Sequence, residues 1–522
     1  MAKPNVRLAE SLKVLRRFQD KHGGVVESLD LTETHRARLV EAGFLRPVIK
    51  GWYLCANPAD TPGDTTAWFA SYWSFLSGYL GKRFGKRYCL NAEVSLALHT
   101  GITTAPRQIT VVTREGGASR IDLPHGTSIM LYTDSKNVPG NRIEVKGLQV
   151  QPLPEALCRA GPNFFRNYPR EAEIALAMVR DPGELLTFLL SGNGYPAAAG
   201  RIAGACRFLG KPGFTERIVI TMKRAGYEVR ESNPFDTPAP TLLPGNRERS
   251  PYVLRLRSMW ESWRADVIKL FPRAPGLPRT PRRYLANVAE RYVADAYNSL
   301  SIEGYQVTEE LIKRVARGGW NPDADTADSK DREALAARGY YQAFNRVKAS
   351  IQSILEGSNA GQVAHTDHHE WYGELFAPAV TVGIIKRHEL AGYRSGPVYI
   401  RNSQHTPLPR EALLDAMETL FDLLAHEPEA AVRAVLGHHL FVFIHPYFDG
   451  NGRIGRFLMN AMLASGGYPW TVIRFKRRAQ YMAALEAASV QGEIKPLAKF
   501  IAQEMRAGTA RASARRKKAS LS

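Results

Sequence analysis

The sequence predicts a multidomain, mainly helical protein whose two halves differ in class, and three observations carry this prediction. The chain has 522 residues, which at roughly 150 residues per domain is enough for about three or four domains. Prolines cluster between residues 233 and 251, where they break helices and strands alike and indicate a linker. Helical spacing dominates from residue 282 onward, whereas short apolar runs and helical stretches alternate before the linker.

The composition restricts the class of protein further. Hydrophobic residues make up 44% of the chain and charged residues 23%, close to the roughly 45–50% and about 25% of ordinary globular proteins. Disorder over the whole chain is therefore excluded. Lysine and arginine exceed aspartate and glutamate, 70 against 50. This excess favours nucleic acid, nucleotide phosphates or anionic surfaces as partners.

Cysteine spacing and the apolar runs indicate the compartment. The cysteines lie far apart without a Cys-x-x-Cys pair, which suggests neither a zinc ribbon nor a disulfide framework and favours a reduced compartment. The longest uncharged run, residues 65–81, contains five Ser or Thr and two Gly, so a buried aromatic helix explains it better than a membrane span. The first residues lack the apolar core of a secretory signal. We expect a cytoplasmic protein without membrane contact, and a homo-oligomer is left open.

Residues 1–60 predict a winged-helix domain. Residues 8–21 carry apolar side chains at helical spacing, and residues 31–42 form a second helical stretch that Gly43 ends. Residues 44–54 contain two short apolar runs on either side of Lys50 and Gly51, which is typical of a hairpin. The hairpin would be the wing.

Residues 61–232 predict an α/β domain. The preceding helix pair and the basic hairpin ending at Gly51, Trp52 and Tyr53 resemble the N-terminal domain of the type IV antitoxin family AbiEi. The region that follows resembles that family too, and the resemblance implies a helix over 88–101 that packs under a strand over 108–113. An ordinary α/β accessory domain is the alternative.

The remaining boundaries follow from composition. Residues 233–281 are expected to be a Pro-rich linker with one helix, and residues 282–505 a helical domain. Residues 506–522 carry six basic residues and no acid, so we expect a disordered basic tail.

A glycine-rich loop at the start of a helix predicts a phosphate site. Gly450, Asn451 and Gly452 have little or no side-chain bulk to keep backbone amides from a ligand, and a helix N-terminus favours anions. Arg453 and Arg456 lie three residues apart on the first turn of that helix, where guanidinium groups bind phosphate oxygens.

The segment from Ile444 to Arg456 contains two further residues, Asp449 and His445, whose side chains can take part in a reaction. Asp449 offers a hard oxygen ligand for Mg²⁺, which usually binds through one or two carboxylates plus substrate phosphates. His445 lies at the end of the preceding apolar helix and has an ordinary pKa of about 6.5, which suits a base that takes a proton from a hydroxyl nucleophile.

Residues 445–456 resemble the signature of the Fic family, His-Pro-Phe-x-(Asp/Glu)-Gly-Asn-Gly-Arg-x-x-Arg, at every position except that Tyr447 replaces Phe. The resemblance implies an all-helical Fic fold with a β-hairpin flap. It also implies an Mg²⁺-dependent transfer of AMP from ATP to a Tyr, Thr or Ser hydroxyl of a target protein, with release of pyrophosphate. In this family His445 would be the general base and Asp449 would hold Mg²⁺. Gly450 to Gly452 would bind the α- and β-phosphates, and Arg453 and Arg456 the β- and γ-phosphates.

Residues 390–409 resemble the flap of that family, which holds the backbone of the target by strand addition. Val398, Tyr399 and Ile400 would form one strand of the hairpin. Asn402 and Leu408 depart from the commoner Gly and Pro of the family segment. A plain surface hairpin is the alternative interpretation.

A second family pattern, Ser-x-x-x-Glu-Gly, lies at Ser299, Glu303 and Gly304. Ser299 and Glu303 are four residues apart and share a face of the helix expected over 292–304. The resemblance implies that Glu303 pairs with Arg456 and excludes the γ-phosphate of ATP, because a carboxylate and a phosphate cannot share one guanidinium group. The chain would then carry its own inhibitor.

Other functions are left open by the sequence. The basic hairpin and the net charge permit a DNA-binding regulator or toxin-antitoxin-type protein in which the Fic-like domain is an effector. Phosphotransfer, as in the Doc branch, or removal of AMP are further alternatives, although Doc lacks the Gly-Asn-Gly step.

Three histidines, His365, His368 and His369, have a spacing compatible with metal ligands on one helix. No carboxylate or cysteine cluster matches them nearby. A solvated helix start is the better interpretation.

Overall fold

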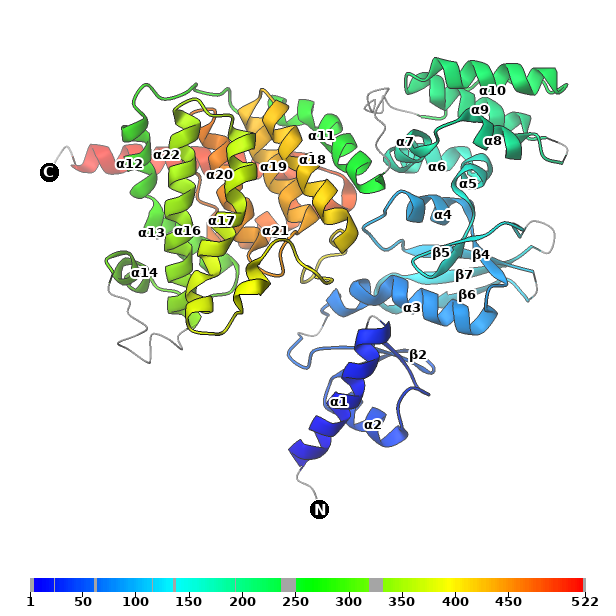
Figure 1. Cartoon of the computed structure of the whole chain (residues 1–522), viewed down its shortest axis with the longest axis horizontal. Coiled ribbons are helices and arrows are strands. Elements are labelled where there is room, and N and C mark those ends of the chain that lie inside the picture. The colour runs from blue at the N-terminus through cyan, green and yellow to red at the C-terminus, as the bar shows by residue number, and fades with distance from the viewer. Residues whose placement is uncertain are drawn as a thin grey trace. The chain divides into compact units, whose positions relative to one another are not determined.

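The computed structural model describes residues 4–22, 24–60, 63–114, 116–134, 138–192, 194–235, 250–318 and 332–519 (Figure 1). The chain divides into two compact units. The first comprises residues 1–258 together with 399–406, and the second comprises residues 259–398 together with 407–522.

The first unit begins with two helices and a three-stranded antiparallel sheet of order β1-β3-β2. Thr32 caps the second helix by accepting a hydrogen bond from the backbone N–H of His35, and Gly51, at φ 86°, permits the tight turn of the hairpin. The hairpin predicted over 44–54 is present, whereas a strand between the helices was not predicted. The name winged helix stays a prediction. The elements are α1 (Pro4–His22), β1 (Val25–Glu27), α2 (Glu33–Glu41), β2 (Leu45–Ile49) and β3 (Trp52–Cys55).

A four-stranded sheet of order β4-β5-β7-β6 follows, with β5 and β7 parallel and the other pairs antiparallel. Apolar side chains of helix α3, which contains most of the uncharged run 65–81, pack against the sheet in one core. The strand predicted over 108–113 is present, but the helix predicted over 88–101 is a strand followed by a shorter helix, because Asn91 caps the new helix at Val94. The elements are α3 (Thr66–Phe84), β4 (Tyr88–Leu90), α4 (Ala92–His99), β5 (Gln108–Thr113), β6 (Ser119–Asp122), η1 (Pro124–Gly126), β7 (Ser128–Thr133), β8 (Ile143–Val145) and β9 (Leu148–Val150).

Helices complete the first unit. Most of them begin with proline, whose fixed φ suits the first helical turn and whose missing N–H is not needed there. They are α5 (Leu153–Arg159), α6 (Pro162–Asn167), α7 (Pro169–Met178), α8 (Pro182–Leu189), α9 (Pro196–Phe208) and α10 (Pro212–Arg224). Among the residues described in both units, no helix is long and apolar enough to span a bilayer.

The second unit is helical and contains the motif segment. The predicted linker contains α11 (Pro251–Leu270), which ends before Pro272. The further helices are α12 (Pro281–Ala289), α13 (Tyr292–Ile302), α14 (Glu309–Ala316), α16 (Arg332–Leu355), α17 (Ala360–Thr381), α18 (Leu413–His426), α19 (Ala430–Ile444), α20 (Asn451–Ala464), α21 (Arg478–Glu486) and α22 (Lys495–Ala519), with short turns η2 (Arg387–Leu390), η3 (Arg410–Ala412), η4 (Phe475–Arg477) and η5 (Ala487–Gln491).

The basic tail differs from its prediction. Residues 506–519, expected to be disordered, continue α22. The segment is rich in Ala, Arg and Lys, which favour helix, and it extends a helix that already exists, so no new nucleus is needed. Residues 520–522 lie outside the described part of the chain.

The β-hairpin flap is also wrong as a prediction of secondary structure. Residues 390–409 form no strand in the described structure. Backbone N–H groups of this stretch form hydrogen bonds with other residues of the first unit. Asn402 N–H donates to Thr66 Oγ1, and Thr406 N–H donates to the Thr103 carbonyl. Asn402 has φ 57°, which also interrupts an extended run. Val398, Tyr399 and Ile400 are therefore an irregular segment.

Candidate active site

The candidate site lies where α19 ends and α20 begins. His445 ends α19 in the left-handed conformation, at φ 56° and ψ 61°, and Gly450 precedes α20 at φ 81°. Gly450 is required there because a Cβ would lie 2.9 Å from the Phe376 ring. The two helices also pack closely at Gly455, where a Cβ would lie 3.0 Å from Val442. Small residues thus allow the loop to turn back over α17.

The loop is closed by its own asparagine. Asn451 is almost fully buried; its Oδ1 accepts from the Tyr447 N–H at 2.9 Å and its Nδ2 donates to the Tyr447 carbonyl at 2.8 Å. This pair of bonds fixes the loop between the two residues. The side chain of Asn451 is therefore occupied, and its backbone amide is the group left for a ligand.

Tyr447 anchors the loop from below. Its ring is buried and stacks on Tyr372, with centroids 3.7 Å apart and planes 5° apart. Its hydroxyl is hydrogen-bonded to His369 Nδ1 at 3.1 Å. His368, beside it, is 1% exposed. The expectation of a solvated helix start at 365–369 fails for His368, which is buried inside α17, whereas His365 and His369 are exposed. Of the three histidines, His369 contacts the motif.

His445 is set up to accept a proton. Its Nδ1 lies 3.1 Å from the Val442 carbonyl, which favours a proton on Nδ1 and leaves the Nε2 lone pair available. Burial, and after it the nearby Arg394 guanidinium, lowers the pKa of His445 to about 4. The imidazole is therefore neutral near pH 7, as a general base must be.

Asp449 stands at the mouth of the loop with its side chain 63% exposed. One oxygen accepts from the Gly450 N–H at 2.6 Å, and the other lies 2.9 Å from Arg453 Nη2. The described residues contain no group of three or more His, Cys, Asp or Glu that would form a metal cage. A single exposed carboxylate fits an ion such as Mg²⁺ that takes its other ligands from phosphates and water.

Arg453 is 1% exposed and lies between two rings. Its guanidinium carbon is 5.3 Å from the Tyr305 centroid and 5.1 Å from the Phe376 centroid, within the range of cation–π attraction. Tyr305 was not predicted at the site. Tyr305 directly follows Gly304 of the Ser-x-x-x-Glu-Gly pattern, and this position in the sequence was the signal that could have identified it.

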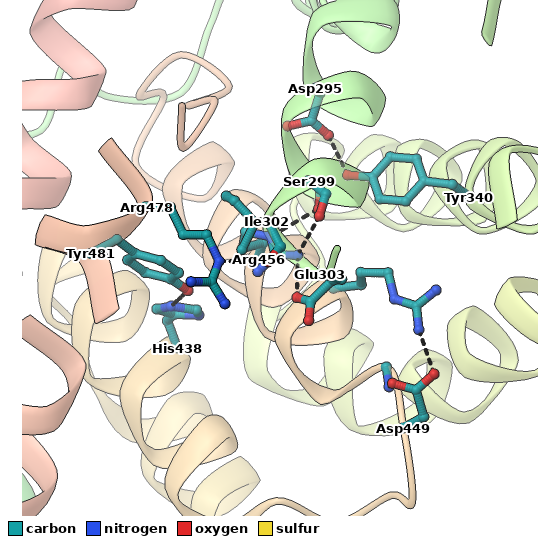
Figure 2. Close-up of polar contacts among 12 residues, drawn as sticks. Asp295, Ser299, Ile302, Glu303, Tyr340, His438, Asp449, Arg456, Arg478 and Tyr481 are labelled. Carbon is teal, nitrogen blue, oxygen red and sulfur yellow. Dashed lines mark hydrogen bonds and ion pairs between the residues drawn. The ribbon is translucent and has the colours of Figure 1, made fainter. Parts of the chain in front are cut away.

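Arg456 is bound by the end of α13. Its Nε donates to Ser299 Oγ at 2.9 Å, and its Nη2 lies 2.7 Å from Glu303 Oε1 and 3.1 Å from the Ser299 carbonyl. Figure 2 shows Ser299 and Glu303 pointing toward Arg456. Although burial disfavours the charged form, the Glu303 carboxylate raises the pKa of Arg456. The two predicted patterns therefore meet, as the resemblance implied.

Glu303 also occupies the space above the glycine loop. A Cβ built on Gly452 would lie 2.4 Å from Glu303 Oε1. Gly304, at φ 90°, ends the helix and lets the chain turn away. The carboxylate thus lies against both the phosphate loop and Arg456.

Further contacts hold α13 in this place (Figure 2). Arg478 Nε donates to the Ile302 carbonyl at 2.8 Å. Phe475 N–H also donates to Asn298 Oδ1 at 2.8 Å. Asp295 is buried and accepts from the Tyr340 hydroxyl at 2.7 Å. Burial raises the pKa of Asp295 to about 6.

Comparisons with known proteins agree with the motif. Residues 368–463 match the Fic/DOC family. The chain is 40% identical over 119 residues to a protein adenylyltransferase Fic of Nematostella vectensis, covering 22% of this chain and 27% of that protein. It is 29% identical over 217 residues to a protein adenylyltransferase Fic of Drosophila willistoni, covering 41% and 40%. The chain thus spans less than half the length of these relatives.

The chain is also similar to solved structures, of which one is a Fic-1 structure. The Fic-1 structure from C. elegans covers 68% of this chain and 100% of its own, with 19% sequence identity and a TM-score of 0.38.

Proposed function

We propose that this chain transfers AMP from ATP to a hydroxyl side chain of a target protein and that Glu303 restrains this activity. The observation that carries the proposal is the juxtaposition of a neutral His445 with the N-terminus of α20 and its two arginines. The match of residues 368–463 to the Fic/DOC family and the names of the relatives support the same reaction.

In the proposed reaction, His445 Nε2 takes the proton of the target hydroxyl as its oxygen attacks the α-phosphorus of ATP. The new oxygen–phosphorus bond forms while the bond to the β-phosphate oxygen breaks, and pyrophosphate leaves with both electrons of that bond. The low pKa of His445 suits this role, because the imidazole is unprotonated at neutral pH.

The start of α20 would bind the phosphates. The backbone amides of residues 451 and 452 lie at a helix N-terminus, where the helix dipole favours anions, and the Gly450 amide beside them donates to Asp449. Arg453 and Arg456 would add guanidinium contacts to the outer phosphates. Asp449 would hold Mg²⁺, which neutralises charge on the phosphates when bound.

The proposed restraint acts at Arg456. While Glu303 is paired with Arg456 and lies over Gly452, the γ-phosphate of ATP meets a carboxylate instead of a guanidinium group. The negative charges of the Glu303 carboxylate and of the γ-phosphate repel each other. ATP would then bind in a geometry that does not present the α-phosphorus to the attacking hydroxyl.

The test is intact-mass analysis and adduct mapping after incubation with Mg²⁺ and ATP. The proteins are the wild type, Glu303→Gly, and Glu303→Gly combined with His445→Ala. We expect an AMP adduct of roughly 329 Da on Glu303→Gly, less on the wild type, and none without His445. Equal labelling of the wild type and Glu303→Gly would refute the restraint.

The same spectrum separates the alternative reactions. A phosphate adduct of about 80 Da would indicate phosphotransfer. Loss of AMP from a target labelled beforehand would indicate removal of AMP. The Gly-Asn-Gly step and its loop favour AMP transfer over the Doc-like alternative.

DNA binding by residues 1–60 has weaker support. Lys50 is exposed at the hairpin turn, but two arginines of α2 already donate to main-chain carbonyls, Arg36 to Ser28 and Arg38 to Arg7. A salt-dependent shift of duplex DNA by full-length protein, lost in Lys50→Ala, would support it.

A further inference from the structure

Arg394 lies beneath the candidate base and is 3% exposed. Its Nε donates to the His445 carbonyl at 2.7 Å, and its backbone N–H donates to the Pro446 carbonyl at 2.9 Å. Both acceptors belong to the turn that follows α19. A single residue, 51 positions earlier in the chain, thus binds the main chain of His445 and of the residue after it.

The backbone of His445 needs such support. A residue with a Cβ in the left-handed region is strained by roughly 1 kcal/mol, and it persists there only when the surroundings enforce the conformation. The Asn451 bonds close the loop downstream of Pro446. The Arg394 bonds act on the left-handed residue itself, and so they bear directly on where the imidazole points.

The same guanidinium closes the base of the segment that follows it. Arg394 Nη1 donates to the Gly396 carbonyl at 2.9 Å, and Nη2 donates to the Leu408 carbonyl. These two carbonyls lie on either side of residues 397–407, which include Val398, Tyr399 and Ile400 of the expected flap. Both ends of this segment and the turn of His445 therefore share one buried side chain.

We propose that Arg394 is a positioning residue that fixes the left-handed turn of His445 and ties the backbone at Gly396 and Leu408 to it. A guanidinium group suits this task because its planar fork donates in several fixed directions at once, which an ammonium cannot do. The inference rests on the proposed function for its kinetic readout only.

The charge of Arg394 provides a second readout. Arg394 lowers the pKa of His445, whereas the nearby carboxylates Glu303 and Asp449 raise it. Replacing Arg394 by a neutral residue should therefore raise the pKa of His445. In Arg394→Lys the charge stays but the fork is lost, so the pKa should move less while the geometry still suffers.

The experiment uses the full chain carrying Glu303→Gly, with Arg394→Gln or Arg394→Lys added. Arg433→Gln is the matched control, because Arg433 also donates to a main-chain carbonyl, that of Glu427, and to Ser465, but not to the site. For each protein, kcat, KM for ATP, the pH profile and the unfolding temperature are measured. The pKa of His445 is followed by NMR in histidine-labelled protein, with the signal assigned by His445→Ala.

We expect Arg394→Gln to lower kcat by roughly 10- to 100-fold, as small misplacements of reacting groups do, with KM for ATP nearly unchanged. The acidic limb of the pH profile should move to higher pH together with the NMR pKa. Arg394→Lys should recover part of kcat and keep the acidic limb low. Arg433→Gln should lower the unfolding temperature without changing either readout.

Two results would overturn the inference. One is a folded Arg394→Gln protein with unchanged kcat and an unchanged pKa of His445. The other is a loss of activity that matches that of Arg433→Gln and tracks stability alone. If the Glu303→Gly parent transfers no AMP, the proposed function fails, and an unmoved NMR pKa in Arg394→Gln then overturns the inference separately.

Discussion

The two arginines of the motif, Arg453 and Arg456, lie on one turn of α20 and are both almost fully buried, yet their surroundings differ in kind. Arg456 binds oxygens of Ser299 and Glu303, which belong to the end of α13. Arg453 lies between aromatic rings and binds Asp449, which belongs to its own loop.

The difference separates contacts that would restrain the site, around Arg456, from contacts that build it, around Arg453. The partners of Arg456 lie 153 residues (Glu303) and 157 residues (Ser299) earlier in the chain, at the end of another helix. Asp449 is four residues from Arg453 and moves with it. We therefore expect changes around Arg456 to release activity and changes around Arg453 to reduce it.

The largest effect is expected at Glu303. Glu303→Gly removes the carboxylate that occupies Arg456, and charged hydrogen bonds of this kind contribute about 2–3 kcal/mol. The rate of AMP transfer should rise by roughly 30- to 150-fold. Glu303→Gln, which keeps the shape without the charge, should give an intermediate rise.

The corresponding change at the partner of Arg453 is Asp449→Asn. In the Glu303→Gly background it should lower the rate and raise the Mg²⁺ concentration needed for half-maximal activity. Measured rates at several Mg²⁺ concentrations check this. A rise in rate would contradict the distinction between the two arginines.

The next effect is a dependence of the stability on pH, caused by Asp295 of α13, the helix whose end contacts Arg456. The folded pKa of Asp295, about 6, exceeds its ordinary value of 3.8, so between these values the folded protein binds more protons than the unfolded chain. Its contribution to stability is favourable below about pH 4 and is lost as pH rises through about 6. Asp295→Asn should stabilise the protein at pH 8 by on the order of 3 kcal/mol and change little at pH 4.

Thermal unfolding at the two pH values measures this difference. Asparagine keeps an oxygen to accept from the Tyr340 hydroxyl, so the contact itself is retained. The same gain at both pH values would show that the carboxylate does not titrate in this window.

How far the sequence predicts the site depends on how local each contact is. The glycine-rich loop, the two arginines and His445 lie within twelve consecutive residues, so their spacing alone brings them together. The pairing of Glu303 with Arg456 spans two helices, and only the resemblance to a known pattern anticipated it. Spacing within one segment could not predict that His369 meets Tyr447, 78 residues later.

The fold divides in a similar way. Helical spacing predicted a helical second half, because the period of 3.6 residues is visible in the sequence itself. The flap strand failed as a prediction because a strand depends on the backbone it pairs with. Residues 399–406 bond to Thr66 and Thr103 instead, and nothing in their own sequence encodes those partners.

A smaller release is expected at Ser299. Ser299→Ala removes the Oγ acceptor of Arg456 Nε but leaves the Ser299 carbonyl and Glu303 in place. One hydrogen bond to a charged group contributes about 1.5 kcal/mol, so the rate should rise by roughly tenfold. Rates of automodification should order as wild type, Ser299→Ala, Glu303→Gly. A rate for Ser299→Ala above that of Glu303→Gly would assign the restraint to the hydroxyl.

The smallest effect is expected at Tyr305, which lies two residues after Glu303 but contacts the other arginine. Its ring covers one side of Arg453, so Tyr305→Leu should loosen the guanidinium by about 0.5–1 kcal/mol and raise KM for ATP by roughly two- to fivefold. Tyr305→Phe keeps the ring and should leave KM unchanged. Steady-state kinetics in the Glu303→Gly background measure both. If Tyr305→Leu instead raises the rate in the wild-type background as Glu303→Gly does, Tyr305 belongs to the restraint, and the end of α13 controls both arginines rather than one.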